Sequence, residues 1–384
     1  MNAFTKLKAG ALQYAIFISI LIAIMVFAFM SLTFMQKKIK IRSGFYKRAI
    51  ENLDNGIQFA KRKEIQYNET LIITQGLEKQ DSTLLKKTSW GVFDLVRVSA
   101  KVQNESFRKA ALLGGHQKNR TALYVQDVHR PIVLVGNTQI EGEVLLPEKG
   151  VKRGSIGGKS YYGDQLIYGP IYQSKEVLPK LQNRKEIFQF SRNFQDDDGL
   201  EVFDELERPK VSCSFFEKTL LISSWDALTL EEVDMQGNIL VHSDSSIFVS
   251  RNVLLEDVIL LAPKIIIEDG VIGSFQAFAS KTIEVGSNCK LNYPSSLVVI
   301  DSAKPDNKNI ESGQIRINNN SQVKGVIAYL TNRTESNNKA QIYIDENATV
   351  TGEVYAEMNL ELKGTVFGMV ITRGFVASHN GASY

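Results

Sequence analysis

One arrangement of apolar and polar positions occurs three times in this chain. Two apolar residues two positions apart are followed by an Asn, and then by an apolar residue, a Gly and a second apolar residue at alternate positions, over 132–144, 315–327 and 342–354. Alternate positions of a strand share one face, Asn tolerates the left-handed backbone of a tight turn, and Gly permits a close approach of two backbones. We therefore expect each stretch to form one coil of a stack that buries a continuous apolar column.

The corners of these coils are where Asn and Gly stand, so we interpret six residues as structural repeat positions. They are Asn137, Gly142, Asn320, Gly325, Asn347 and Gly352. A fourth, looser copy runs over 265–275, and short apolar clusters separated by Gly, Asn, Asp and Ser fill 238–372. Strands this short, with polar corners, are typical of a β-helix and not of a β-sandwich.

The repeat resembles the coils of bactofilins, bacterial polymer-forming proteins whose core is a small right-handed β-helix. The likeness rests on the Ile-x-Ile, Asn and Val-x-Gly-x-Val positions of the copies at 315–327 and 342–354. It covers about a third of the chain with a generic solenoid pattern, so it implies the fold more than it implies polymerisation.

A second pattern is an unbroken apolar run near the N-terminus, where no charged residue lies between Lys8 and Lys37. A helix needs about 20 apolar residues to cross a bilayer, so we expect a membrane span over 11–36 after a short tail, 1–10. A cleaved signal peptide is the alternative, but its apolar region is about 7 to 15 residues long and ends at small residues, whereas large apolar residues stand there. Small residues at every fourth position of the span predict a face for packing against another membrane helix, namely Ala11, Ala15, Ser19 and Ala23.

Beyond the span, apolar residues recur at every fourth position among charged ones, which predicts an amphipathic juxtamembrane helix over 37–66. The period then shortens toward two, which predicts a small α+β module over 67–115. A helix that is first apolar and then amphipathic, packed on a small sheet, resembles the type IV pilin and pseudopilin family. In that family a prepilin peptidase cuts after a Gly and the new fifth residue is usually Glu, whereas the fifth residue beyond Gly10 here is Ala15.

Together the patterns predict a mainly β protein with a single N-terminal transmembrane and amphipathic helix, a small α+β module and then a β-solenoid, more specifically a right-handed β-helix. We expect the first solenoid coil at 116–147 and the main solenoid at 219–384. Between them, 148–218 breaks the repeat with a Gly- and Tyr-rich stretch and a charged stretch. It is interpreted as an insertion that carries specific contacts to a partner.

Composition limits the partners and leaves the membrane orientation open. The 45 Lys and Arg nearly balance the 42 Asp and Glu, so nucleic acid is not an expected partner. The only cysteines, Cys213 and Cys289, stand in no metal-ligand spacing and either pair or remain buried thiols. Basic residues after the span favour a cytoplasmic domain by the positive-inside rule. Large domains are translocated largely regardless of charge, so a periplasmic domain is our expectation and a cytoplasmic one the alternative.

Candidate chemistry is sparse. The stretch 157–160 lacks the first Gly of a phosphate-binding loop, and the four histidines show no metal-ligand spacing. The acidic pairs at 256–257 and 268–269 are candidate carboxylates of a polysaccharide-cleaving β-helix, but solvated corners are the simpler interpretation. We expect no catalytic residue, no cofactor and no metal.

The sequence therefore predicts a non-enzymatic, membrane-anchored structural or assembly protein of the bacterial cell envelope. Its solenoid is expected to be a rigid scaffold or a stacking and binding surface, held by a single span in the inner membrane. The expected partners are the membrane and other envelope or assembly proteins, with self-association as a further option. The alternatives are a pilin- or pseudopilin-like component of a secretion or pilus machine, and a membrane-tethered, polysaccharide-active β-helix enzyme.

Overall fold

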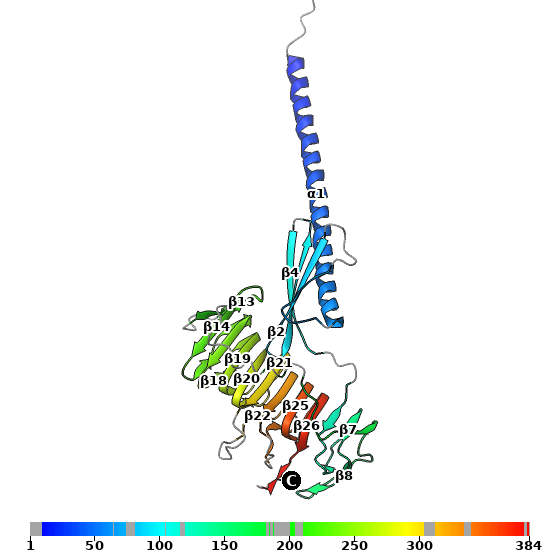
Figure 1. Cartoon of the computed structure of the whole chain (residues 1–384). Helices are drawn as coiled ribbons and strands as arrows, with labels where there is room; N and C mark the ends of the chain where they lie inside the picture. Colours follow the sequence, from blue (N-terminus) through cyan, green and yellow to red (C-terminus); the bar gives the residue numbers. More distant parts are fainter. Residues whose placement is uncertain are drawn as a thin grey trace, which may run out of the picture. The chain divides into compact units, whose positions relative to one another are not determined.

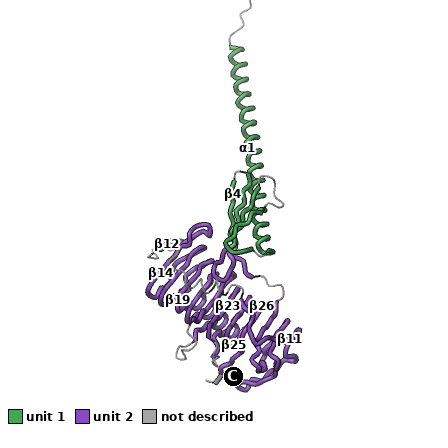
Figure 2. Tube along the Cα trace, in the orientation of Figure 1, with its two compact units in different colours: residues 1–87, 96–111 green, residues 88–95, 112–384 purple. Residues whose placement is uncertain are grey.

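The chain is mainly β with one N-terminal helix in the part that the structure describes, which confirms the expected class at this level (Figure 1). The computed structural model describes residues 10–63, 65–73, 81–103, 105–115, 120–181, 184, 187, 200–203, 210–302, 312–333, 339–379 and 382–383. It divides into two compact units, coloured separately in Figure 2. Unit 1 comprises residues 1–87 and 96–111, and unit 2 comprises residues 88–95 and 112–384.

Unit 1 contains the helix α1, which runs without a break over Gly10–Arg62 and is blue in Figure 1. The expected span and the expected amphipathic helix are therefore one element. Its first part is long and apolar enough to cross a membrane, and none of that window is buried within the chain. Its later part buries Ala49, Leu53, Gly56 and Ile57, the spacing of one helical face.

The helix packs closely on a small sheet of unit 1. The sheet has the order β1 (Thr70–Ile73), β2 (Asp81–Trp90), β3 (Phe93–Val102) and β4 (Glu105–Leu113), and β1 runs antiparallel to β2. A Cβ on Gly56 would lie 2.6 Å from Cγ1 of Val98, so glycine lets the helix approach β3. Glycine is about 1 kcal/mol less favourable than alanine inside a helix, and the close packing on β3 offsets this cost.

Unit 2 contains a closed, hydrogen-bonded region of parallel strands, which we call the parallel region. Its strands are β5 (Leu123–Val125), β7 (Val144–Leu146), β11 (Ile171–Gln173), β12 (Leu200–Phe203), β13 (Lys210–Cys213), β14 (Thr219–Ser224), β15 (Leu228–Leu230), β16 (Asp234–Gly237), β17 (Ile239–Ser243), β18 (Ser246–Val249), β19 (Leu254–Ile267), β20 (Ile272–Val285), β21 (Lys290–Asp301), β22 (Gln314–Ile317), β23 (Gln322–Thr331), β24 (Ile342–Ile344), β25 (Thr349–Leu362) and β26 (Thr365–Phe375).

Shorter strands of unit 2 lie outside this region. The strand β6 (Ile132–Leu134) pairs in parallel with β8 (Val151–Arg153). Two antiparallel pairs join β9 (Ser155–Ile156) to β10 (Lys159–Ser160) and β27 (Ser378–His379) to β28 (Ala382–Ser383).

The core of the parallel region is a set of columns of like side chains. One column joins paired neighbours in the order Ile265, Ile283, Ile315, Ile342 and Leu360. All five are fully buried, at 0 % exposed. In-register pairing sets equivalent side chains beside one another. The recurrence of apolar residues in the sequence thus becomes a continuous core, in which each buried Ile or Leu contributes about 1.5–3 kcal/mol.

The spatial order of the strands departs from their order in the sequence. Ile371 of β26 pairs with Tyr124 of β5, β5 pairs with β7, and β7 pairs with β11. The strands β5, β7 and β11 thus extend the parallel region next to its last strand in the sequence, and Figure 1 shows β7 beside β26. Within 148–218, where an insertion was expected, β11, β12 and β13 all join the parallel pairing.

Candidate functional site

The repeat residues of the copies at 315–327 and 342–354 occupy equivalent places beside or on neighbouring parallel strands. Asn320 and Asn347 both have left-handed backbone, with φ of 61° and 59°. Gly325 pairs directly with Gly352, and their φ values are 145° and 141°. A Cβ on Gly352 would lie 2.0 Å from the carbonyl oxygen of Gly325, so only glycine fits there.

The copy at 132–144 meets the same demands with a different residue. Gly142 has a φ of 111°, but the left-handed residue of the preceding turn is Gly136, with a φ of 62°, and not Asn137. A Cβ on Gly142 would lie 3.0 Å from Cβ of Ala122, a far milder contact than at Gly352. In this copy the left-handed residue of the turn therefore stands one position earlier than the sequence pattern predicts.

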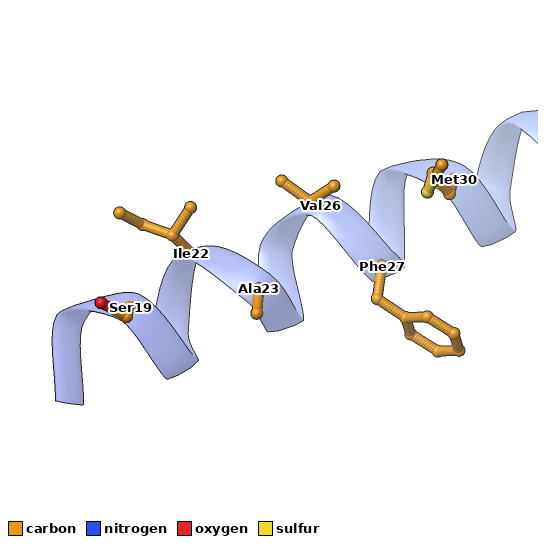
Figure 3. Close-up of a pocket in the computed structure, with 6 residues that line it drawn as sticks. All are labelled: Ser19, Ile22, Ala23, Val26, Phe27 and Met30. Carbon is orange, nitrogen blue, oxygen red and sulfur yellow. The ribbon is translucent and has the colours of Figure 1, made fainter. Parts of the chain in front are cut away.

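The expected packing face of the membrane span is partly hollowed. Ser19 and Ala23 line a shallow depression on α1 together with larger side chains (Figure 3), which are Ile22, Val26, Phe27 and Met30. The hydroxyl of Ser19 donates a hydrogen bond to the carbonyl of Ala15, 2.7 Å away, so it is satisfied within the helix. Ala11 and Ala15 lie on the same helix but do not line the depression.

Two of the acidic residues considered for polysaccharide chemistry accept hydrogen bonds from the backbone. The backbone N–H of Arg251 donates to Glu268 at 3.0 Å, and that of Ser287 donates to Asp269 at 2.6 Å. Burial, together with the neighbouring Glu256, raises the pKa of Asp257. The carboxylates of Glu268 and Asp269 thus link turns at the ends of neighbouring parallel strands.

Register brings one histidine next to a serine that sequence reasoning had not joined. Ser223 of β14 is the strand neighbour of His242 of β17, and Oγ lies 3.2 Å from Nδ1. Nε2 of the same ring lies 3.8 Å from a carboxylate oxygen of Asp244. The pair became visible only once the register was known, because 223 and 242 are distant in sequence. Cys213 and Cys289, which were expected either to pair or to remain buried thiols, form no disulfide with each other; Cys289 is buried and Cys213 is half-buried.

The parallel region also has an outer apolar face that other segments of the chain cover. Its residues alternate along the strands with those of the core, yet they are themselves fully buried. Representative members at 0 % exposed are Ile259, Phe278, Val298 and Leu330. Outward apolar residues of this number would aggregate if they met water, so other segments of the chain must cover them.

One covering segment is the turn between β2 and β3, residues 88–95, which belongs to unit 2. Gln276, 1 % exposed, holds both sides of this turn. Its Nε2 donates to the carbonyl of Trp90 and its Oε1 accepts from the N–H of Val92, each at 2.9 Å. Gly91 lies between them with a φ of 64°, and a Cβ there would lie 2.2 Å from Oε1 of Gln276.

Aromatic contacts extend this docking on either side. The indole N–H of Trp90 donates to the carbonyl of Asp257 at 2.9 Å, and its ring meets Phe215 edge-on, with centroids 5.4 Å apart. Phe93 meets Tyr293 in the same way at 5.6 Å. Such pairs add about 0.5–1.5 kcal/mol each beyond the area they bury.

A second covering segment, which we call the strap, consists of residues 174–181 with Arg184 and Ile187. Tyr124 of β5 donates its hydroxyl to the carbonyl of Val177 and Tyr355 of β25 donates to that of Pro179, both at 3.0 Å. The strap therefore contacts both β5 and β25 of the parallel region.

The far end of the strap is fixed by a guanidinium group. Arg184 meets both carboxylate oxygens of Glu357, at 3.0 and 3.1 Å, and donates to the carbonyl of Thr331 at 3.0 Å. The hydrogen bond to Glu357 raises the pKa of Arg184. A bidentate pair of this kind fixes geometry as well as charge.

Sequence reasoning missed Gln276, Trp90 and Arg184. The only signal for Gln276 was a polar residue inside an apolar run, and Arg184 stood in a stretch that looked like a charged, solvated insertion. Comparison with protein-family models, with curated proteins and with solved structures finds no match to this chain.

Proposed function

We propose that this protein is a non-enzymatic, membrane-anchored structural or assembly protein of the bacterial cell envelope. The parallel region is its rigid part and has the character of a right-handed β-solenoid, as the resemblance to bactofilins implies. The apolar part of α1 is the single anchor in the inner membrane, and the large domain lies in the periplasm. Its partners are the membrane and other envelope or assembly proteins, or further copies of itself.

The observation that carries this proposal is the use of the outer apolar face. Two segments separated in sequence, 88–95 and the strap, lie on the coils and are held by the Gln276 and Arg184 contacts. A stack of parallel strands with fully satisfied edges is stiff, and its regular faces offer many equivalent docking positions. The chain already uses one such face for its own segments, which supports a scaffold role.

A pilin- or pseudopilin-like component is the second candidate. The observation that favours it is the close packing of α1 on the sheet of unit 1, where Gly56 faces Val98 of β3. The carboxylates of Glu268 and Asp269 are engaged with backbone N–H groups, which favours either structural role over a polysaccharide-active enzyme.

A topology experiment tests the proposal. A protease-sensitive tag placed after Tyr384 in a bacterial host should be cleaved when the outer membrane is opened and the inner membrane is intact. Removal of residues 1–36 should release the protein from the membrane fraction. A tag protected in the cytoplasm would contradict the periplasmic placement and the pilin-like candidate together.

A second measurement tests the absence of catalysis. The purified chain should leave envelope polysaccharides uncleaved, as should a Glu256→Gln, Glu268→Gln double variant. Cleavage by the wild type that the double variant loses would overturn the non-enzymatic proposal.

Exposed Trp225, 83 % accessible, is a suitable place for a photo-crosslinking residue that captures envelope partners.

A further inference from the structure

Ligand-type side chains meet where three strands of the parallel region end. Asp127 and His129 follow β5, Glu148 follows β7 and Glu176 follows β11. One ligand atom each from Asp127, His129 and Glu148 lies within 4.8 Å of the other two. Parallel strands bring their carboxyl ends to one edge, so residues from three separate stretches of sequence are gathered there.

Asp127 is a fixed member of this cluster. The residue is 6 % exposed, and its two carboxylate oxygens accept the backbone N–H groups of His129 at 2.8 Å and of Glu148 at 2.9 Å. These two hydrogen bonds, that from Glu148 first, lower the pKa of Asp127. A carboxylate has about four lone-pair sites, and these two hydrogen bonds together with one from the side chain of Gln173 leave room for one further partner.

The ring of His129 lies between two carboxylates. Its Nδ1 is 3.8 Å from Oδ1 of Asp127, and its Nε2 is 3.5 Å from Oε1 of Glu176. Metal-binding histidines commonly hold the ion through one ring nitrogen and donate the other N–H to a carboxylate. The backbone of His129 is left-handed, with a φ of 58°.

The buried hydroxyl of Ser174, in the stretch that bonds Asp127, is a second indication of a bound ion or water. Ser174 is 6 % exposed, and its Oγ has no hydrogen-bond partner among the residues that the structure describes. It stands between Gln173, whose side chain bonds Asp127, and Lys175, whose carbonyl accepts the N–H of Asp127. Buried polar atoms are normally satisfied, so a water or ion is expected at this turn.

We propose that Asp127, His129 and Glu148 bind one divalent transition-metal ion of the zinc class, with Glu176 as a positioning residue for the imidazole. One nitrogen and two carboxylate donors suit zinc, which takes such ligands at about 2.0–2.2 Å, more than calcium or magnesium, which take oxygen alone. Closing the present separations to that distance requires movement of the exposed side chains of His129 and Glu148. The ion would fasten the ends of β5 and β7 to each other, and β11 would be linked to them through the contact of Glu176 with the imidazole.

The test is metal titration of the full chain in detergent micelles, purified without a polyhistidine tag. Zinc is followed by calorimetry, and cobalt(II) serves as a spectroscopic probe. We expect one saturable equivalent of zinc and a rise in the thermal unfolding midpoint when zinc is present, because the ion binds only the folded state.

Substituted variants distinguish a specific metal site from nonspecific binding of metal to the protein surface. His129→Asn removes the ring and keeps a residue that tolerates left-handed backbone. It should abolish binding of the one zinc equivalent without altering the thermal unfolding midpoint measured in the absence of metal. His242→Asn is the matched control, since that ring also lies 3.8 Å from a carboxylate, and it should bind as the wild type does. Glu176→Gln should weaken binding about tenfold to a hundredfold while the cobalt spectrum persists.

The inference is overturned if the wild type binds no stoichiometric zinc, or if His129→Asn binds as tightly as the wild type. Equal loss in the His129 and His242 variants would likewise reduce the effect to adventitious surface binding and overturn it. None of these outcomes bears on the scaffold function, because membrane topology is measured separately.

Discussion

Two stretches with the same sequence pattern have different surroundings in this molecule. In the copy at 342–354, Ile342 lies between Ile315 on one side and Leu360 on the other. In the copy at 132–144, Ile132 pairs with Val151 in a separate two-stranded sheet, and only the final Val144 enters the parallel region. The pattern thus encodes the shape of a coil and its apolar face, but not the neighbours of that coil.

Burial follows the same division. Ile342 and Val350 are completely buried, whereas Ile132 is 9 % exposed and Ile140 only partly buried. We therefore expect equivalent substitutions to be more harmful in the copy at 342–354 than in the copy at 132–144.

The largest contrast is expected at the glycines. Gly352→Ala would place a Cβ 2.0 Å from a backbone oxygen at a φ of 141°, so we expect a loss of more than about 4 kcal/mol, or failure to fold. Gly142→Ala meets only another Cβ, at 3.0 Å, and should cost about 1–3 kcal/mol through its backbone strain. Thermal unfolding followed by circular dichroism measures both, and equal losses would contradict the comparison.

The next contrast concerns the core. Ile342→Ala should destabilise by about 3–5 kcal/mol, because neighbours on both sides keep the cavity open. Ile132→Ala should stay near 2 kcal/mol, since its edge position lets the surroundings relax. Denaturant midpoints of the two variants give the difference. A larger loss at Ile132 would show that the sheet of β6 and β8 is central to stability.

The smallest contrast is at the turn asparagines. Asn347→Ala should cost about 1–2 kcal/mol, because alanine resists the left-handed backbone. Asn137→Ala should change stability by less than about 0.5 kcal/mol, since the left-handed residue of that turn is Gly136. Asn347→Gly is the control that should be tolerated. An equal cost at both asparagines would contradict the shifted turn.

Local features of the fold were predictable because they depend on residues that are close together in the sequence. The run without charges predicted the apolar part of α1, and the corner residues Asn320 and Asn347 carry the left-handed backbone that their type favours. The order of the strands was not predictable, because every coil presents similar edges to its neighbours. Nothing local shows that β5 pairs with β26.

The candidate sites were less predictable than the fold for the same reason. Asp127, His129 and Glu148 come from separate stretches, so their spacing in sequence resembles no metal motif. Gln276 is a polar residue within an apolar stretch, and nothing in the sequence indicates that it binds the turn at Trp90 and Val92. Contacts between distant segments depend on register, which periodicity alone does not determine.

The central claim, that 120–173 extends the parallel region beyond β26, is tested most directly by a cysteine pair. Tyr124→Cys with Ile371→Cys, with Cys213 and Cys289 replaced, joins residues paired across adjacent strands. Strands about 4.8 Å apart lie within the range of about 4.4–6.8 Å between Cα atoms that a disulfide spans. Oxidation should cross-link this pair and leave Tyr124→Cys with Ile259→Cys unlinked. A cross-link only in the second pair would contradict the claim.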